Sequence, residues 1–445
     1  MVEYPYKGLA SYDEADSRFF CGRESDRKIV AANLMSHRLT VLYGPSGVGK
    51  SSLLIAGVAA QLREGAADNR KENGIPESVV VSFRSWRRAD PLAALISTVR
   101  GSVAAIVGGK ASEPMRSRSG FVEALEESTE MLDGELFIIL DQFEEYFLYH
   151  LEEDGEATFA TEFPRAVKRP NLRVSFLVCI REDSLARLDR FKPALPELFD
   201  NSIRLKPLDV ASARVAIEEP VEEYNRLLAF GEDRVQLESA LVEEVLRATS
   251  MSRVITPGQS AKARVEASYL QVVMSRLWAE ERRVGSHVIR LETLRRLGEA
   301  EGMLRNYLES VVNELTIGEQ EVAAKVFRFM ITPSGGRISL TPSDLAAYAG
   351  LHESDVKSVL EKVVRLRIVD AVVPSMGRPE VVEYQIMHDL VASAVVDWQQ
   401  RYWFRAGQHG QQVEEATVRR LRWWVAGLTA LSVVSLIAAV IAWIK

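Results

Sequence analysis

A glycine-rich turn near the start of the sequence has the residue types and the spacing of a phosphate-binding loop. In the run VLYGPSGVGKSSLL, the residues from Gly44 to Ser51 satisfy G-x-x-x-x-G-K-[ST], between an apolar run typical of a strand and a helical pattern. Such a loop turns main-chain N–H groups toward phosphate oxygens, while its lysine reaches the β and γ phosphates and its serine supplies an oxygen to Mg²⁺. The pattern predicts that ATP or ADP, with Mg²⁺, is bound by Gly44, Pro45, Ser46, Gly47, Val48, Gly49, Lys50 and Ser51.

A carboxylate in the run LFIILDQFEEYF is the expected second ligand of the metal. Asp141 directly follows apolar residues that are typical of a buried strand, where it would share Mg²⁺ with Ser51. Many nucleotide hydrolases carry a glutamate next, which polarises the attacking water, but here Gln142 follows, so we expect slow hydrolysis. Glu144 and Glu145 come shortly after. Either they include a catalytic base, with Glu144 favoured by its closeness to the strand, or they form the solvated start of a helix.

An arginine ends the next apolar run, VSFLVCIRED. Arg181 would therefore lie at the carboxyl edge of the sheet, where open parallel sheets bind their ligands. There it can read a γ phosphate. The alternative is a surface salt bridge with Glu182 or Asp183.

Short apolar runs alternate with helical patterns in the first half of the chain, which predicts an α/β fold with a parallel sheet. Strand-like runs occupy 38–44, 77–83, 136–141, 174–180 and, more weakly, 202–208. Helix formers dominate after about residue 210, and SMSRVITPGQSAKAR (250–264) is the expected mobile loop there. The predicted units are an N-terminal segment (1–37), an ATPase core (38–210) and a helical lid (211–315).

The pattern changes again near residue 317, where three helical runs precede two short strand-like runs. This order predicts a winged helix over 316–403, with Gly350 ending the second helix and Thr341 or Ser343 capping its start. The helices are expected at 318–330, 341–350 and 353–367, and the strands at 368–373 and 381–386.

An uncharged run from Trp423 to Ile444 is the candidate membrane-spanning helix. It would be roughly 33 Å long, enough to cross a bilayer core, and it follows a linker helix expected at 404–422. Arginines precede the run and tryptophans lie at both ends, which places the large N-terminal part in the cytoplasm. We therefore expect a single-pass protein of the inner, cytoplasmic membrane.

Charge and cysteine content limit the other function classes. The formal net charge is −7, so bulk attraction to nucleic acid is not expected. Only two cysteines occur, Cys21 and Cys179, and they suggest neither a disulfide framework nor a metal-ligand spacing.

Several blocks of the chain, in order, resemble those of the bacterial novel-STAND NTPases, which are AAA-like signal-transduction ATPases. The resemblance covers roughly residues 4–403. The blocks are YPYKGLASYDEADSRFFCGRESDRKIV, GPSGVGKSSLL, FIILDQFEEYF, LVCIREDSLARL, IRLKPLDVASARVAIEEP, VEASYLQVVMSRLWAEE, EGMLRNYLESVV and YQIMHDLVASAVVDWQQRYW.

The resemblance implies an additional-strand ATPase core, a helical lid and a winged helix that closes over ADP. It implies an adenine-side motif at Gly22, Arg23 and Glu24, and it adds Ser52 to the phosphate loop. Asp141 matches the magnesium carboxylate, Arg181 the sensor arginine, and His388 the histidine that touches the ADP β phosphate. One position departs, because Ser268 stands where relatives commonly carry a proline.

These features favour a switch in which ADP locks the winged helix onto the core, ATP exchange opens it, and opened protomers form a homo-oligomer. The trigger and effector proteins are not identified by the sequence. One alternative is a DNA-binding regulator, whose candidate helix carries Lys357, Lys362 and Arg365 together with acidic residues. Another is a membrane-tethered motor. In the tail, Gly427, Thr429, Ser432 and Ser435 are candidate helix-contact residues within the bilayer.

Overall fold

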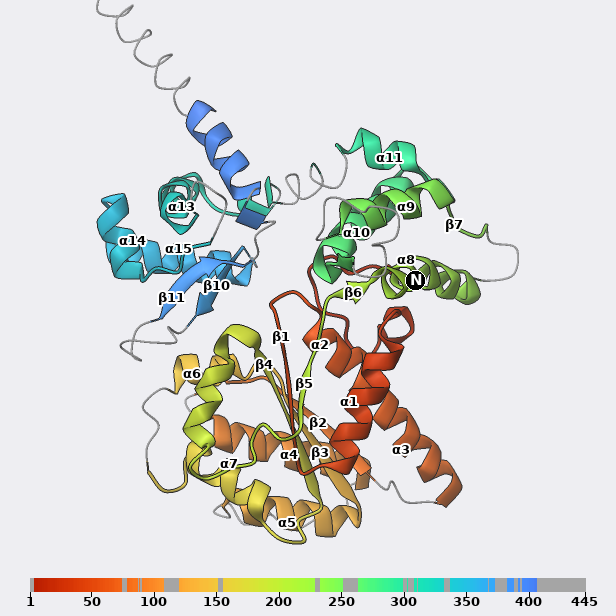
Figure 1. Cartoon of the computed structure of the whole chain (residues 1–445), viewed down its shortest axis with the longest axis vertical. Helices are drawn as coiled ribbons and strands as arrows, with labels where there is room; N and C mark the ends of the chain where they lie inside the picture. The colour runs from red at the N-terminus through yellow and green to blue at the C-terminus, as the bar shows by residue number, and fades with distance from the viewer. Residues whose placement is uncertain are drawn as a thin grey trace, which may run out of the picture.

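The computed structural model covers a core, a helical lid and a C-terminal unit (Figure 1). It describes residues 4–73, 78–86, 88, 90–107, 120–150, 155–228, 233–250, 263–298, 302, 308–309, 311–331, 337–366, 368–372, 382–387, 391–392 and 394–405.

The core is built on a five-stranded parallel sheet with the order β2-β3-β4-β1-β5. Its strands are β1 (Leu39–Gly44), β2 (Ser78–Phe83), β3 (Glu135–Leu140), β4 (Val174–Arg181) and β5 (Ser202–Arg204). Strand β4 separates the strand before the phosphate loop from the strand before Asp141, which is the additional-strand order that was predicted. The register pairs Gly44 with Arg181, so the phosphate loop and this arginine leave the sheet side by side.

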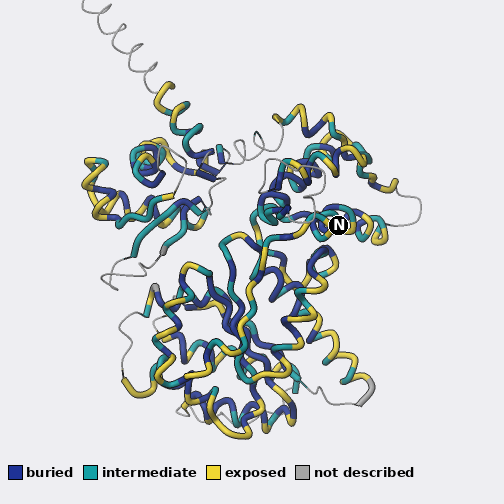
Figure 2. The backbone as a smooth tube through the Cα atoms, in the orientation of Figure 1, coloured by how far each residue is buried: buried dark blue, intermediate teal, exposed yellow. Residues whose placement is uncertain are grey.

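Helices cover both faces of this sheet, which explains why its strands read as nearly continuous apolar runs. Side chains alternate between the faces: Leu42, Phe137 and Leu177 pack on one side, and Val41, Ile138 and Val178 on the other. On the first face lie α1 (Glu24–Ser36), α2 (Lys50–Ser52), the π-helix η2 (Leu53–Ala59) and α3 (Ala60–Asn73). On the second lie α4 (Pro91–Val107), α5 (Phe121–Leu132) and α7 (Phe159–Lys168). Figure 2 shows the strands as the most continuously buried part of the core.

The lid follows β5 and is mostly helical, as expected. It contains α8 (Val210–Leu227), α9 (Ser239–Ala248), α10 (Ala267–Arg283) and α11 (Leu291–Arg296). It also contains short strands that the sequence did not predict: β6 (Leu208–Asp209) pairs with β8 (Arg264–Val265), and β7 (Gln236–Leu237) pairs with β9 (Val288–Ile289). Strands this short carry no readable periodicity. The predicted run 202–208 is likewise divided between β5 and β6.

The C-terminal unit has the predicted order of three helices and an antiparallel pair of strands. These are α13 (Ile317–Met330), α14 (Pro342–Ala349), α15 (Glu353–Arg365), β10 (Val369–Val372) and β11 (Glu383–Ile386). Thr341, rather than Ser343, caps α14 by accepting a hydrogen bond from the Asp344 N–H at 3.0 Å. Gly350 ends α14 in the left-handed conformation. In Figure 1 the lid and this unit both lie over the end of the sheet that carries the phosphate loop.

Three expectations fall outside the described residues. They are His388, most of the loop 250–264, and the linker and candidate span from residue 406 onward. Within the described ranges, no helix has both the length and the apolar character needed to cross a bilayer.

Candidate functional site

The phosphate loop is shaped by glycines at positions where a side chain would clash or would strain the backbone. A Cβ on Gly44 would lie 2.7 Å from the main-chain oxygen of Leu205, and Gly47 and Gly49 have φ angles of 74° and 96°. These positive values belong to the left-handed region that favours glycine. The chain then enters α2 at Lys50, whose ammonium group donates to the carbonyls of Gly44 at 2.9 Å and Pro45 at 3.0 Å. The lysine is thus held at the loop that it was predicted to serve.

Asp141 leaves β3 as a buried carboxylate with no hydrogen-bond partner. Its exposed fraction is 2%, and neither side-chain oxygen is satisfied within the described part of the protein. Its main chain is held firmly, because its N–H donates to Phe83 and its carbonyl accepts the indole N–H of Trp86 at 2.7 Å. An unpaired buried carboxylate is costly unless a cation compensates it. The orphaned oxygens therefore fit the predicted divalent cation.

The donor set also suits magnesium. Ser51 lines the same cavity as Asp141, and no cluster of three or more His, Cys, Asp or Glu side chains suited to a metal occurs among the described residues. Magnesium is usually held by one or two protein oxygens together with phosphate oxygens and water. Two protein ligands beside a phosphate loop are consistent with this pattern.

Glu144 begins α6 (Glu144–Tyr149) and faces the same cavity. Its Oε2 accepts a hydrogen bond from the main-chain N–H of Arg181 at 3.2 Å. Burial raises the pKa of the Glu144 carboxyl from 4.5 to about 7, although the nearby charges of Lys50 and Arg181 act in the opposite direction. Gln142 directly follows Asp141, where many nucleotide hydrolases carry a glutamate. It has a φ of 54°, which is unusual for a residue with a side chain. Glu144 and Glu145 both line the cavity that the phosphate loop also lines, so the structure does not separate the two candidates by position.

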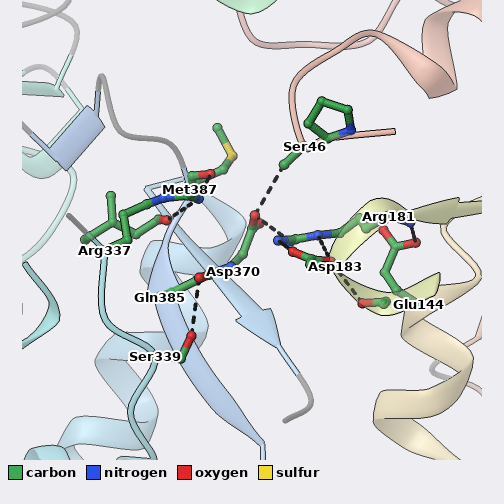
Figure 3. A network of polar contacts seen from close by, with 12 residues as sticks. Ser46, Glu144, Arg181, Asp183, Arg337, Ser339, Asp370, Gln385 and Met387 are labelled. Carbon is green, nitrogen blue, oxygen red and sulfur yellow. Dashed lines mark hydrogen bonds and ion pairs between the residues drawn. The ribbon is translucent and has the colours of Figure 1, made fainter. Parts of the chain in front are cut away.

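Arg181 lies at the end of β4 with a nearly buried guanidinium group. Its Nε and Nη2 donate to the two carboxylate oxygens of Asp183, at 3.2 and 2.6 Å, which realises one of the salt bridges considered from the sequence. Its Nη1 points the other way and donates to Asp370 of β10 at 2.7 Å (Figure 3). Burial alone would lower the pKa of Arg181, but the carboxylates of Asp370 and Asp183 raise it overall. Glu182, the other partner considered, pairs with Arg204 instead.

The motif at Gly22, Arg23 and Glu24 contacts the main chain of the phosphate loop. Arg23 donates to the main-chain oxygen of Val48 in the phosphate loop and to that of Lys206, both at 2.8 Å. Glu24 accepts the N–H of Gly22 at 2.9 Å. Arg23 lines the cavity, whereas Gly22 and Glu24 are absent from its walls. These contacts hold the shape of the loop.

One cavity of about 390 Å³ collects most of the predicted residues, a size that suits a small-molecule ligand. Gly44 and Pro45 shape the loop without lining the cavity. The predicted residues in its wall are Arg23, Ser46, Gly47, Val48, Gly49, Lys50, Ser51, Ser52, Asp141, Glu144 and Arg181. The lid contributes Leu208, Ser268 and Gln271, and the C-terminal unit contributes Arg365, Asp370 and Met387.

Sequence reasoning missed several residues of this site. Tyr12 donates from its hydroxyl to Gln271 at 2.8 Å and from its main chain to Ser52 at 3.2 Å, which ties the N-terminal segment to both the lid and the loop. Trp86 and Asp370 were also missed. Tyr12 lies within a block that was read only for its family resemblance, and Trp86 lies outside the blocks and strand runs that were used. Asp370 interrupts an apolar strand run. For Asp370, the one feature of the sequence that could have drawn attention to it was a charged residue inside an apolar strand run.

The solved structures with a similar course of the chain include two ORC proteins and a Walker-type ATPase. The ORC1 protein of Aeropyrum pernix, solved in complex with DNA, gives a TM-score of 0.47 at 17% identity, covering 85% of this chain and 93% of its own. The ORC2 protein of the same organism, with ADPNP and ADP, gives 0.45 at 14% identity, covering 85% and 95%. A Walker-type ATPase of Pyrococcus abyssi gives 0.44 at 16% identity, covering 88% and 99%. These scores are too low to assign a function to this chain.

Comparison with curated proteins finds no significant match. A family model does match: the model described as Novel STAND NTPase 1 aligns with residues 5–427, nearly the whole chain. That range includes the phosphate loop, Asp141, Arg181 and the C-terminal unit. The resemblance inferred from the sequence blocks is thereby confirmed, and the chain belongs to the novel STAND NTPase 1 family.

Proposed function

We propose that this protein is a nucleotide-controlled switch that binds ATP and ADP and hydrolyses ATP slowly. ADP favours the closed arrangement, with the C-terminal unit docked on the core. Exchange for ATP favours an open arrangement, and the opened protomers assemble into a homo-oligomer. Such a switch moves only as far as the two nucleotides differ in their affinity for the two arrangements.

The observation that carries this proposal is the shared wall of the nucleotide cavity. The phosphate loop and the distant C-terminal unit line the same space, and the ion pair between Arg181 and Asp370 joins them at its edge. A housekeeping hydrolase needs no such contact between a phosphate-reading arginine and a separate unit. A switch requires it, since the nucleotide must bias the docking of the moving part.

Each residue has a role in this proposal. Lys50 and the loop N–H groups bind the phosphates, and Arg181 reads the terminal one. Ser51 and Asp141 would hold Mg²⁺, which supplies charge neutralisation to the phosphates when it is bound. Glu144 accepts the proton of the attacking water. In this proposal His388 contacts the ADP β phosphate from the C-terminal unit, one residue after Met387 of the cavity wall.

The proposed switch is tethered to the inner membrane by residues 423–444, with its large N-terminal part in the cytoplasm. The support is the sequence itself, with its long uncharged run and flanking arginines. Membrane fractionation of the full chain, against a chain in which three central residues of the run are replaced by lysine, tests this tether. Recovery of both chains in the soluble fraction would contradict it.

Structural observations count against the DNA-binding alternative. Lys357 of α15 pairs with Glu353 at 2.7 Å, and Lys362 pairs with Glu319 of α13. Arg365, the third basic residue, lines the nucleotide cavity. Two of the three positive charges thus have acidic partners and the third lies at the cavity, so the helix presents a weaker basic surface than its sequence alone suggests.

The direct test is the nucleotide content of the full chain, purified in mild detergent and denatured to release what it holds. We expect near-stoichiometric ADP, identified by chromatography, together with turnover well below the ordinary enzymatic range of about 1–10³ per second. A chain with Lys50→Ala should lose the nucleotide, which controls for adventitious carry-over. An empty site with brisk ATP turnover would contradict the switch and favour a motor or housekeeping ATPase.

A further inference from the structure

One carboxylate of the C-terminal unit reaches two phosphate-reading groups of the core at once. The Oδ2 atom of Asp370 accepts from Nη1 of Arg181 at 2.7 Å and from the hydroxyl of Ser46 at 3.4 Å (Figure 3). Ser46 belongs to the phosphate loop, and Arg181 lies at the neighbouring strand end. An acceptor oxygen placed between these donors occupies the position expected for an oxygen of a terminal phosphate.

The position of Asp370 is imposed by its own unit. Its neighbour Val369 is fully buried. Asp370 itself pairs in the β10–β11 ladder with Gln385, which accepts a hydrogen bond from Ser339 at 3.3 Å. The Met387 N–H closes the hairpin by donating to Ile368 at 2.9 Å. The carboxylate is therefore presented on a braced strand rather than on a free loop.

Arg181 already pairs with two carboxylates. Asp183 takes Nε and Nη2 in a bidentate pair, so Nη1 is the donor directed toward the C-terminal unit. A terminal phosphate bound at the second hydrogen of Nη1 would lie beside the carboxylate of Asp370. The phosphate and the carboxylate are also both anions, and at contact distance in a partly buried site their repulsion amounts to more than thermal energy.

We infer that Asp370 is the specificity-determining residue of the closed arrangement: its carboxylate takes the place of the γ phosphate, so this arrangement accepts a nucleoside diphosphate and rejects the triphosphate. The inference rests on the proposed switch and assigns the discrimination to one side chain. ADP leaves the Arg181–Asp370 pair intact. ATP breaks it, and the C-terminal unit is released because its carboxylate has lost its partner.

The test compares the affinities of the full chain, stripped of nucleotide, for ADP and for a non-hydrolysable ATP analogue by calorimetry. Asp370→Asn keeps the shape of the side chain and removes its charge, so the analogue should bind at least about tenfold more tightly while ADP affinity changes by less than about threefold. Asp370→Glu, which restores the charge, should restore the preference for ADP. Glu353→Gln removes a carboxylate from the exposed start of α15, and it should leave both affinities unchanged.

The outcomes separate this inference from the proposed function. If the unsubstituted chain prefers ADP and Asp370→Asn keeps the same preference, Asp370 is not the discriminator, although the switch stands. If ADP and the analogue leave the C-terminal unit of the unsubstituted chain equally resistant to limited proteolysis, the two nucleotides favour the same arrangement, and the switch and the inference both fail. Limited proteolysis adds a second reading: the analogue should expose the C-terminal unit of the unsubstituted chain, and Asp370→Asn should expose it even with ADP.

Discussion

The indole N–H of Trp86 donates to the main-chain carbonyl of Asp141 at 2.7 Å, which ties this carboxylate residue to an aromatic cluster. Trp86 is fully buried and makes edge-to-face contacts with Phe83, Phe143 and Phe159. This cluster lies against the sheet at the carboxyl end of β3. The position of the carboxylate is thus set by packing as well as by the strand.

Trp86→Phe should therefore weaken the magnesium dependence of nucleotide binding. The substitution keeps an aromatic ring but leaves the Asp141 carbonyl without its buried donor, at a cost of about 1–3 kcal/mol in the free energy of unfolding. Denaturant unfolding and nucleotide affinity with and without Mg²⁺ measure the two effects. Trp278→Phe is the matched control, because Trp278 is equally buried in the lid and packs on Tyr224. Equal loss of magnesium dependence in both variants would contradict a specific role for Trp86.

Asp141→Asn should stabilise the nucleotide-free protein and abolish its response to Mg-ATP. The wild-type carboxylate is buried and has no hydrogen-bond partner among the residues that the structure describes, so replacing it with a neutral amide removes a penalty of about 1–2 kcal/mol. In the wild type, ligand at a hundred times its Kd adds about 2.7 kcal/mol, and the variant should lose that gain. Thermal unfolding with and without Mg-ATP measures both. A variant that is destabilised without ligand would contradict this account of Asp141.

ATP hydrolysis should rise with pH through about 7 if Glu144 is the base. The carboxyl must be ionised to accept a proton, and burial raises its pKa to about 7. Glu144→Gln should reduce turnover by about 10²–10⁴-fold and flatten the profile, whereas Glu145→Gln should keep the profile. Single-turnover hydrolysis between pH 5.5 and 8.5 measures this dependence. An unchanged profile in Glu144→Gln would assign the titration to another group.

The same carboxyl should also make stability depend on pH. Its pKa is higher in the folded protein than the ordinary value of 4.5, so the folded state holds the proton more tightly than the unfolded state between these values. The free energy of unfolding should fall as the pH rises from about 4.5 to about 7, by roughly 1–3 kcal/mol from this group. Glu144→Gln should show a shallower decline in denaturant titrations across that range.

Gly22→Ala should destabilise the protein strongly. Gly22 has a φ of 83°, and a Cβ there would lie 2.3 Å from the main-chain oxygen of Ser212 in α8. The strain alone is about 1–3 kcal/mol, and the contact with backbone adds to it. Gly65→Ala is the control, because Gly65 lies within α3 with no atom near its would-be Cβ, and it should gain about 0.5–1 kcal/mol. Thermal unfolding of both variants provides the comparison.

The parallel sheet and the phosphate loop were predictable because local sequence determines them. Buried strands need apolar runs, and the loop needs its glycines, so the positions of Gly44, Lys50 and Asp141 follow from the order of residues alone. The two-residue strands of the lid were not predictable, because a strand of that length has no period to read. Gln142 was noted for its type, but its left-handed backbone depends on the tertiary setting.

The contact between Asp370 and Arg181 could not be predicted from the sequence for a different reason. Within IVDAVV, Asp370 reads as one polar residue on the solvent side of a short strand, and nothing local links it to a residue 189 positions earlier. Asp370 reaches Arg181 only because the C-terminal unit docks on the core. Tyr12 and Gln271 were missed for the same reason, since their contact joins the N-terminal segment to the lid across 259 positions.

The N-terminal segment has a consequence for how the nucleotide domain is delimited in experiments. Gly8, Tyr12 and Phe20 form part of the cavity wall, and Arg23 holds the phosphate loop to the chain entering the lid. A recombinant fragment that begins at Lys28 would retain every motif residue from Gly44 to Arg181 and still lack one side of the binding site. The boundary of the functional domain therefore lies well upstream of its diagnostic motif, and sequence searches that start at the motif would truncate it.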